Sequence, residues 1–382
     1  MGEGESSAID IHRLLQTMVE QGASDLHLTA ESPPALRING NLYPLKTQPL
    51  TGREVEKLAH SILNDIQKKT FDDINEIDLS FRWRNKTRFR ANFFRQKGYV
   101  AGAIRMIPTE ARPLAQLGLP SSVDGLAKRP NGLVLVTGPT GSGKSTTLAS
   151  IVDSINSTHR GHIITIEDPI EFVHTHKKCI VNQREVGADT HGFANALRYI
   201  LRQDPDVVLV GEIRDLETME ATLRIAETGH LALATLHTNN AIQTIHRILD
   251  FFPSHQQDMV RTQLSFVLEG VISQQLLARQ DGQGRVLACE VLIANSAIRN
   301  LIREDKTHQI YSHLQMGQGK HGMLTFNQSL LSHIQSRAIS TEHAIEKSHD
   351  AEELQAMIGK AISTGNTGRT SPAAGGAKRR GR

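Results

Sequence analysis

The residues with the clearest chemical meaning run from Gly138 to Thr146, GPTGSGKST, and match the phosphate-binding pattern G-x-x-x-x-G-K-[ST]. The apolar run LVLVT precedes them and the helical pattern STTLASIVDSI follows, which is the context that this motif requires. Glycines let backbone N–H groups crowd around phosphates, and a helix N-terminus adds its positive end. The stretch therefore predicts that the protein binds a nucleoside triphosphate.

Two residues of this loop have predicted tasks of their own. Lys144 should contact the β- and γ-phosphates, and Ser145 should bind Mg²⁺, so ATP and Mg²⁺ are the expected ligands. The predicted nucleotide-binding residues are Gly138, Pro139, Thr140, Gly141, Ser142, Gly143, Lys144, Ser145 and Thr146.

Carboxylates follow two further apolar runs. Glu167 comes after HIITI in the box TIEDPIEF, and Glu212 comes after DVVLVG. Ligands of open α/β sheets sit at the carboxyl ends of the strands, so both acids are candidates for the site, although acids at strand ends are also common as solvated loop residues. Mg²⁺ keeps several waters and takes one or two carboxylates, so Glu212 can reach it through a water even though Gly211 directly follows the strand. Glu167 can orient the attacking water or hold the metal.

Two histidines, His230 and His237, flank the apolar run LALATL. Their spacing matches no zinc motif such as H-E-x-x-H, so we exclude a metal site. A hydrogen-bonding role near the γ-phosphate and ordinary packing both remain open for them.

The 382 residues suggest two domains, each large enough for its own core. The first half reads as mixed helices and strands, including a hairpin at Asn39-Gly40, whereas apolar runs alternating with helices after residue 131 predict a mainly parallel sheet covered by helices. The predicted division is a flexible leader (1–8), an α+β domain (9–108), a linker (109–130), an α/β domain with a helical C-terminal part (131–365) and a disordered basic tail (366–382).

Charge and composition narrow the class of protein. The net charge of the chain is +3. The tail holds five Lys and Arg residues and no acid, so the rest of the chain has a net charge of about −2. A near-neutral body argues against a nucleic-acid translocase, whose channel is usually basic. No apolar run approaches the roughly 18–20 residues of a membrane span, and the polar N-terminus is unlike a signal peptide, which predicts a cytoplasmic protein. Cys179 and Cys289 are far apart and are expected to be buried thiols.

Taken in order, these motifs resemble the secretion-type ATPases, hexameric motors of type II secretion and type IV pili. The resemblance includes the phosphate loop, TIEDPIEF, LRQDPD…GEIRDLET and AETGH…TLHTN. QGASDLHL, VNQREVG, AIRNLIRE and GMLTFNQSL are similar to one branch, the PilT-like retraction ATPases, over about residues 8–360. Pilus-extension and type II secretion ATPases typically carry a four-cysteine zinc insert, which two separated cysteines cannot build.

The resemblance implies an α/β fold, a RecA-like P-loop NTPase domain preceded by a smaller PAS-like α+β domain. In it, Glu167 resembles the acid that activates the lytic water and Glu212 the acid at the Mg²⁺ strand, with the division between them left open. His230 and His237 look like sensors of nucleotide state. Arg90 and Arg105 resemble arginines that reach the triphosphate when domains close; the alternative is a basic strand surface.

The resemblance also implies the task and the partners. The protein would be a homo-hexameric ATPase that retracts the type IV pilus in twitching motility. It would act on an inner-membrane platform protein at the base of the pilus machine, with peripheral membrane association only and no nucleic acid, and a paralogous retraction ATPase is a further candidate partner. The alternatives are an accessory retraction paralogue, a pilus-extension or type II secretion ATPase, and a nucleotide-switched binding protein. AIRNLIRE itself reads as an amphipathic helix burying Ile298, Leu301 and Ile302.

Overall fold

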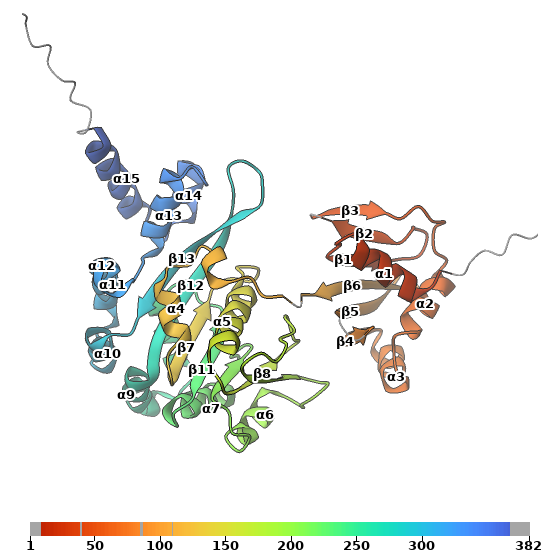
Figure 1. Cartoon of the computed structure of the whole chain (residues 1–382), viewed down its shortest axis with the longest axis horizontal. Coiled ribbons are helices and arrows are strands. Elements are labelled where there is room, and N and C mark those ends of the chain that lie inside the picture. Colours follow the sequence, from red (N-terminus) through yellow and green to blue (C-terminus); the bar gives the residue numbers. More distant parts are fainter. Residues whose placement is uncertain (1–8, 39, 85–86, 109, 367–382) are drawn as a thin grey trace, which may run out of the picture. The chain divides into compact units, whose positions relative to one another are not determined.

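The structure is a computed structural model that describes residues 9–38, 40–84, 87–108 and 110–366, and it divides into two compact units (Figure 1). The first unit holds the described residues up to Ala111 together with the segment Pro169–Thr175. The second unit holds Arg112–Asp168 and the described residues from His176 onwards. The predicted leader and nearly all of the predicted tail lie outside the described residues.

In its described residues the first unit forms a six-stranded antiparallel sheet with the order β3-β2-β1-β6-β5-β4. Its strands are β1 (Asp25–Leu28), β2 (Ala35–Ile38), β3 (Asn41–Pro44), β4 (Glu76–Trp83), β5 (Thr87–Gln96) and β6 (Tyr99–Ile107). β2 and β3 form the predicted hairpin, of which Asn39 itself lies outside the described residues. The helices are α1 (Ile11–Glu20), α2 (Gly52–His60) and α3 (Asp65–Ile74).

One face of this sheet carries the core of the first unit. Leu26, Ile104 and Ala91 are opposite one another on neighbouring strands and are fully buried together with side chains of α1, α2 and α3. Because side chains alternate across a strand, the residues next to them point to the opposite face. That second face is where the polar residues Asp25 and Arg105 lie.

The second unit is built on a seven-stranded sheet of its described residues, with the order β13-β12-β7-β11-β10-β8-β9. All neighbouring pairs are parallel except β12 and β13, so the predicted mainly parallel sheet is confirmed. Every residue of the central strands is buried, as expected for a sheet covered on both faces. The strands are β7 (Gly132–Thr137), β8 (His162–Glu167), β9 (Ile180–Glu185), β10 (Val207–Val210), β11 (Leu231–Leu236), β12 (Leu268–Ala278) and β13 (Arg285–Ile293).

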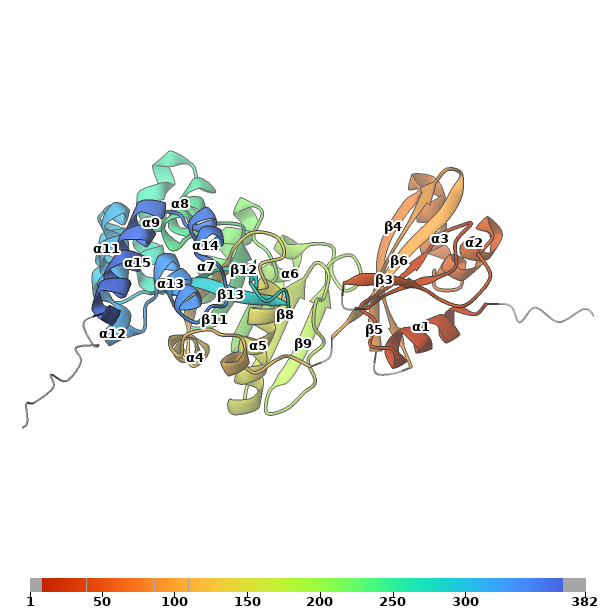
Figure 2. The ribbon, with the colours of Figure 1, turned by 90° about the horizontal axis from the view of Figure 1, so that it is seen from above.

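Helices cover the two faces of this sheet and its β13 edge (Figure 2). On one face lie α6 (Phe193–Ile200), α7 (Leu216–Glu227), α8 (Ala241–Asp250), α9 (Gln257–Val267), α10 (Ser296–Arg303) and α11 (Ile310–Met316). On the other face lie α4 (Ser122–Ala127) and α5 (Lys144–Thr158). The remaining helices are α12 (Gln318–His321) and, near β13, α13 (Phe326–Gln335), α14 (Thr341–Lys347) and α15 (Ala351–Asn366). Short 3-10 turns lie at Leu114–Gln116, Ser254–Gln256 and Thr307–Gln309.

The predicted amphipathic helix within AIRNLIRE is α10. It buries Ile298, Leu301 and Ile302, as expected. Arg299, which the pattern places away from that side, is instead half-buried: it donates to the carbonyls of Ser265 and Phe266 in the last turn of α9. This arginine therefore caps a neighbouring helix, whose last carbonyl groups lack partners within the helix.

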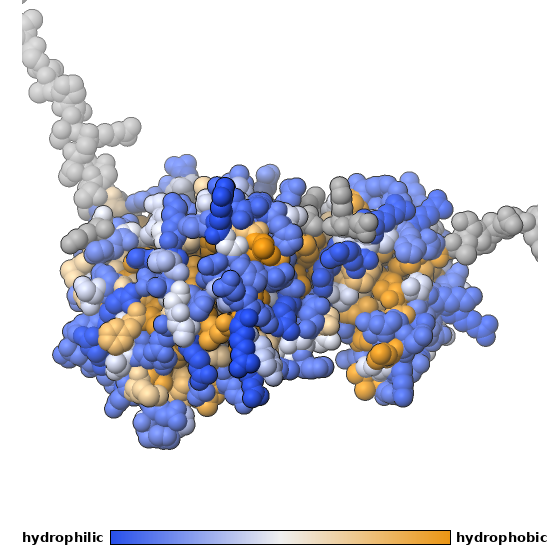
Figure 3. Space-filling model, turned by 60° about the horizontal axis from the view of Figure 1, so that its bottom comes forward, coloured by the Kyte–Doolittle hydropathy of each residue, from blue (hydrophilic) through white to orange (hydrophobic). Residues whose placement is uncertain are grey.

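Two general features agree with the composition. Cys179 and Cys289 are both free and buried. None of the helices in the described ranges combines the length and the apolar character that a membrane span needs. On the face shown in Figure 3, hydrophilic residues are interspersed with smaller apolar areas.

Candidate nucleotide-binding site

The phosphate loop connects β7 to α5, the strand and helix that its sequence context predicts. Gly138, Gly141 and Gly143 have φ angles of 142°, 78° and 92°, a region that residues with a Cβ rarely adopt. At Gly138 there is also no space, because a Cβ would lie 2.2 Å from the backbone oxygen of Gln274. The glycines of the motif are thus required by the path of the backbone.

The nine loop residues differ in exposure. Pro139, Thr140 and Gly141 are exposed at the tip, Gly138 and Ser142 are buried, and Gly143, Lys144, Ser145 and Thr146 are half-buried at the start of α5. Lys144 Nζ donates to the carbonyl oxygens of Gly138 at 2.8 Å and Pro139 at 3.1 Å, so its ammonium group lies across the loop. Phosphate oxygens are the natural substitute for these carbonyl acceptors.

The two predicted carboxylates lie at the ends of adjacent parallel strands. Ile166 of β8 pairs with Val210 of β10, and the Gly211 N–H donates to the Ile166 carbonyl at 2.8 Å. A Cβ on Gly211 would lie 3.1 Å from that carbonyl oxygen and 3.2 Å from the Cα of Glu167. Glycine after the strand therefore allows the backbone leading to Glu212 to pass close to Glu167.

Glu167 accepts hydrogen bonds from Thr165 Oγ1 at 2.6 Å and Gln183 Nε2 at 3.2 Å. Thr165 is two residues earlier on the same strand, and Gln183 comes from the neighbouring strand β9. These contacts fix the direction of the Glu167 carboxylate at the carboxyl edge of the sheet.

Glu212 lies in a charged cluster. Arg214 Nη2 is 2.8 Å from one of its oxygens and His237 Nε2 is 3.0 Å from the other. The hydrogen bond from Arg214, helped by the charges of Arg214 and His237, lowers the pKa of Glu212 although partial burial acts against this. Glu212 is therefore held as a carboxylate. The sequence reasoning missed Arg214; its position two residues after Glu212 was the available signal.

The structure brings His237 into the site but does not bring His230 there. His237 directly follows β11 and contacts Glu212, whereas His230 directly precedes β11. The intervening six residues span about 20 Å, so His230 lies at the opposite edge of the sheet. There its Nδ1 is 3.0 Å from Thr228 Oγ1, and its carbonyl accepts from Gly132 N at the start of β7.

Arg90 and Arg105 lie in the first unit, directly opposite each other on β5 and β6. In the same row across the sheet, Asp25 pairs with Arg105 on one side and with Arg37 on the other. We call these four residues the arginine row. The side chains of Arg90 and Arg105 are 40% and 69% exposed, so both guanidinium groups reach solvent.

Carboxylates hold the arginine row in place. Arg105 Nε donates to Asp25 Oδ1 at 2.7 Å, and Arg90 Nη2 is 3.7 Å from Asp78 Oδ1. Burial alone would raise the pKa of Asp25, but hydrogen bonds from Ser24 and Arg105 and the charge of Arg105 outweigh it, and the pKa lies below its ordinary value. Asp25 is only 6% exposed, so its partners carry most of its charge compensation.

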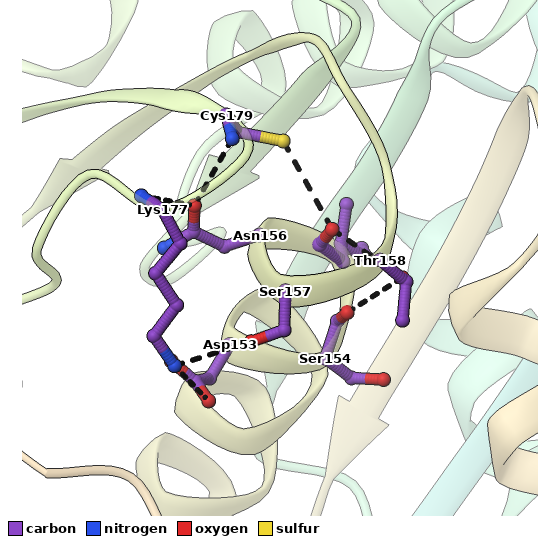
Figure 4. A network of polar contacts seen from close by, with 8 residues as sticks. Asp153, Ser154, Asn156, Ser157, Thr158, Lys177 and Cys179 are labelled. Atoms are coloured by element: carbon purple, nitrogen blue, oxygen red, sulfur yellow. Dashed lines mark hydrogen bonds and ion pairs between the residues drawn. The ribbon is translucent and has the colours of Figure 1, made fainter.

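A polar network fastens the chain to α5 after the segment Pro169–Thr175 (Figure 4). Lys177 Nζ contacts Asp153 at 2.6 and 2.9 Å. The buried amide oxygen of Asn156 accepts from the backbone N–H groups of Lys177 at 3.1 Å and Cys179 at 3.3 Å. The helix that begins at the phosphate loop thus fixes the start of β9.

Comparisons with known proteins identify relatives over most of the chain. The family described as Type II/IV secretion system protein matches residues 3–372. The type IV pilus retraction ATPase PilT of Pseudomonas aeruginosa is 50% identical over 89% of this chain and 98% of its own length. A twitching motility protein of Neisseria gonorrhoeae is 47% identical over 91% of this chain and 92% of its own length.

A solved structure gives the same result in three dimensions. The crystal structure of the pilus retraction motor PilT with bound ADP matches with a TM-score of 0.86 and 54% identity, covering 91% of this chain and all of that chain. The predicted fold class, a RecA-like P-loop domain preceded by a smaller α+β domain, is confirmed by this match.

Proposed function

The chain belongs to the type II/IV secretion system protein family, and from this premise we propose that it is an ATP-hydrolysing motor that powers retraction of type IV pili. The observation that carries the proposal is a phosphate loop after β7 with two carboxylates at the same edge of the sheet, Glu167 at the end of β8 and Glu212 just after β10, in a chain 50% identical to a pilus retraction ATPase. The loop provides nucleotide binding, and the carboxylates provide the means of hydrolysis.

The residues at the loop fit a magnesium ion. A Ser145 hydroxyl and a Glu212 carboxylate are hard oxygen donors, and one or two such groups plus waters are what Mg²⁺ takes in phosphate-transfer sites. Ser145 and Glu212 would hold the ion, and it would supply positive charge that stabilises the transferring phosphoryl group. Arg214 and His237 orient the Glu212 carboxylate and keep it ionised.

We assign the general base to Glu167. Glu212 has a lowered pKa and is engaged by Arg214 and His237, which makes it a weak proton acceptor and suits it to the metal side. Glu167 is directed by Thr165 and Gln183 at the same edge of the sheet, where it can orient the attacking water. His237 contacts Glu212 and is assigned to sensing the nucleotide state; His230, at the far edge, is not.

Arg90 and Arg105 are proposed to act on the transferring phosphoryl group when the units close on the nucleotide. Their support is their neighbouring position and their exposed guanidinium groups. Arginine in such a role neutralises charge that develops only in the transition state, which links hydrolysis to the movement of domains. We also propose that the first domain ends at residue 108 and that the second begins at residue 131.

Pilus retraction requires an assembly. We propose a homo-hexamer at the cytoplasmic base of the pilus machine, acting on an inner-membrane platform protein through peripheral association, with a paralogous retraction ATPase as a further partner. Rigid-body movement of the units around a ring would convert hydrolysis into work on the filament.

The test is deletion of the gene in its own host, followed by counting surface pili by electron microscopy and by a twitching assay. More pili without twitching support the retraction motor. A bald cell would assign the chain to pilus extension, and abundant pili with twitching retained would assign it to an accessory role. Complementation with Lys144→Ala, compared with the unchanged gene, tests whether the phenotype depends on ATP hydrolysis.

A further inference from the structure

The phosphate loop is supported by a strand that lies outside its motif. β12 pairs with β7 in parallel, and its Ser273 is aligned with Thr137, the last residue before the loop. The next residue of β12, Gln274, is 2% exposed. A glutamine this deeply buried must satisfy both ends of its amide or lose stability.

Both ends of the Gln274 amide contact the loop region. Its Nε2 donates to the Ser142 carbonyl at 2.9 Å, and its Oε1 accepts from Thr147 Oγ1 at 2.9 Å. A carbonyl oxygen can only accept, which determines the orientation of the amide. The two bonded residues, Ser142 and Thr147, bracket the four residues 143–146, which lead into α5.

Gln274 also contacts two of the loop glycines. A Cβ on Gly143 would lie 3.2 Å from Gln274 Nε2, and a Cβ on Gly138 would meet the Gln274 backbone oxygen. Gln274 therefore lies against the loop at Gly138 and Gly143 and against Thr147 in the helix that follows the loop. Because glycine-rich segments lose much conformational entropy on ordering, a fixed contact of this kind lowers what nucleotide binding must supply.

We propose that Gln274 is a positioning residue of the nucleotide site, which holds Gly143, Lys144 and Ser145 in the geometry that receives the phosphates. It touches no substrate atom itself and acts through the Ser142 carbonyl and the Thr147 hydroxyl. The inference rests on the proposed nucleotide site, since it names the residue that shapes that site from a neighbouring strand.

The test compares Gln274→Leu with Gln275→Leu in the full chain. Gln275 is the next residue of β12 and points to the opposite face of the sheet. For Gln274→Leu the Kd for Mg-ATP should rise about 10- to 100-fold, as expected when buried hydrogen bonds are lost and partners are left unsatisfied. KM should rise with it, while kcat at saturating ATP stays within about threefold, because binding in the ground state and the transition state is weakened alike. Gln275→Leu should change the Kd less than about twofold.

The melting temperature separates positioning from a purely structural role. If Gln274 positions the loop, added ATP should raise the melting temperature of Gln274→Leu less than that of the unaltered protein, because the Kd is higher. This holds whether or not the substitution changes the melting temperature without nucleotide. An unchanged Kd, with only the nucleotide-free melting temperature lowered, would overturn the proposal. If the unaltered protein bound no ATP, the proposed function itself would be overturned.

A second variant tests the same contact from the other side. Thr147→Val removes only the hydroxyl that donates to Gln274, and should raise the Kd about 3- to 10-fold. Combined with Gln274→Leu it should add less than about twofold, since the bond is already lost. Fully additive effects would overturn the role assigned to Gln274. If Gln274→Leu does not fold, Thr147→Val alone is the test, and an unchanged Kd for it would overturn the proposal.

Discussion

The phosphate loop and the arginine row are both candidate anion sites, but they are built in opposite ways. The loop is contiguous in sequence, its tight backbone path requires glycine, and β12 braces it from one side. The arginine row is assembled from four strands, the side chains of Arg90 and Arg105 are 40% and 69% exposed, and carboxylates already engage them. The preformed backbone of the phosphate loop suits nucleotide binding in every state of a hydrolysis cycle. The exchangeable ion pairs of the arginine row suit a contact that is made in only one of those states.

The sharpest way to break this comparison is to remove the positive charge of the loop. Lys144→Ala should reduce ATP turnover to background, because the positive charge that contacts the β- and γ-phosphates is lost. Phosphate release at saturating Mg-ATP measures it, and Lys178→Ala, an exposed lysine of the same unit, is the matched control. Near-normal turnover by Lys144→Ala would show that the loop is not the site.

The row should affect turnover and leave the fold intact. Arg105→Ala is expected to lower kcat by up to the factor of about 10³–10⁵ known for arginines that complete a phosphoryl-transfer site. ATP affinity should change far less, because the contact forms only when hydrolysis is prepared. Arg13→Ala, an exposed arginine on α1 in the same unit, is the control. If both variants turn over ATP equally, Arg105 is a surface residue.

For the Glu212 cluster we expect an effect smaller than that of Lys144 or Arg105. Glu212→Gln keeps the size of the side chain but removes the charge that Arg214 and His237 engage. The Mg²⁺ concentration for half-maximal turnover should rise about 10- to 100-fold, as for groups that hold a metal through water. Titrating Mg²⁺ at fixed ATP measures this, with the exposed Glu217→Gln as control. An unchanged Mg²⁺ requirement would remove Glu212 from the metal side.

What the sequence could predict follows the same division between local and assembled features. The phosphate loop is specified by nine neighbouring residues and the elements on each side of it, so pattern and propensity suffice. The alternation of apolar runs likewise predicts a parallel sheet, and the ends of its strands locate Glu167 and Glu212. The reason for Gly211 appears only once β8 and β10 are aligned, because a Cβ at this position would lie against the backbone of Ile166 and Glu167.

Contacts between distant strands could not be read from the sequence. Arg90 and Arg105 become neighbours through the register of β5 and β6, and Gln274 reaches Ser142 across 132 residues of chain. The separation of His230 from His237 could have been predicted, because the six mostly apolar residues between them form a strand whose two ends lie at opposite edges of the sheet. From the sequence we expected a helical C-terminal part and no strand at residues 268–278, so neither β12 nor its contact with the loop was predicted.

The smallest effect expected is on stability, and it concerns how the arginine row is held. In the native state the pKa of Asp25 lies below its unfolded value of about 3.9, so its ionised form contributes stability at neutral pH, and this is lost as the pH falls below about 4 through the native pKa. Asp25→Asn keeps an oxygen that can accept from Arg105 but removes the charge. It should lower stability at pH 7 by about 1 kcal/mol, since Arg105 is largely exposed.

Urea unfolding between pH 3 and 7 measures this, followed by the fluorescence of Trp83, the only tryptophan of the chain and a buried residue of the first unit. The unaltered protein should lose stability on the acid side more steeply than Asp25→Asn, and the two curves should converge there. Parallel curves would mean that Asp25 is no more favourably placed in the folded unit than in the unfolded chain. The row would then be held by Asp78 and backbone register alone, and its arginines would be freer to leave the sheet than the geometry at Asp25 implies.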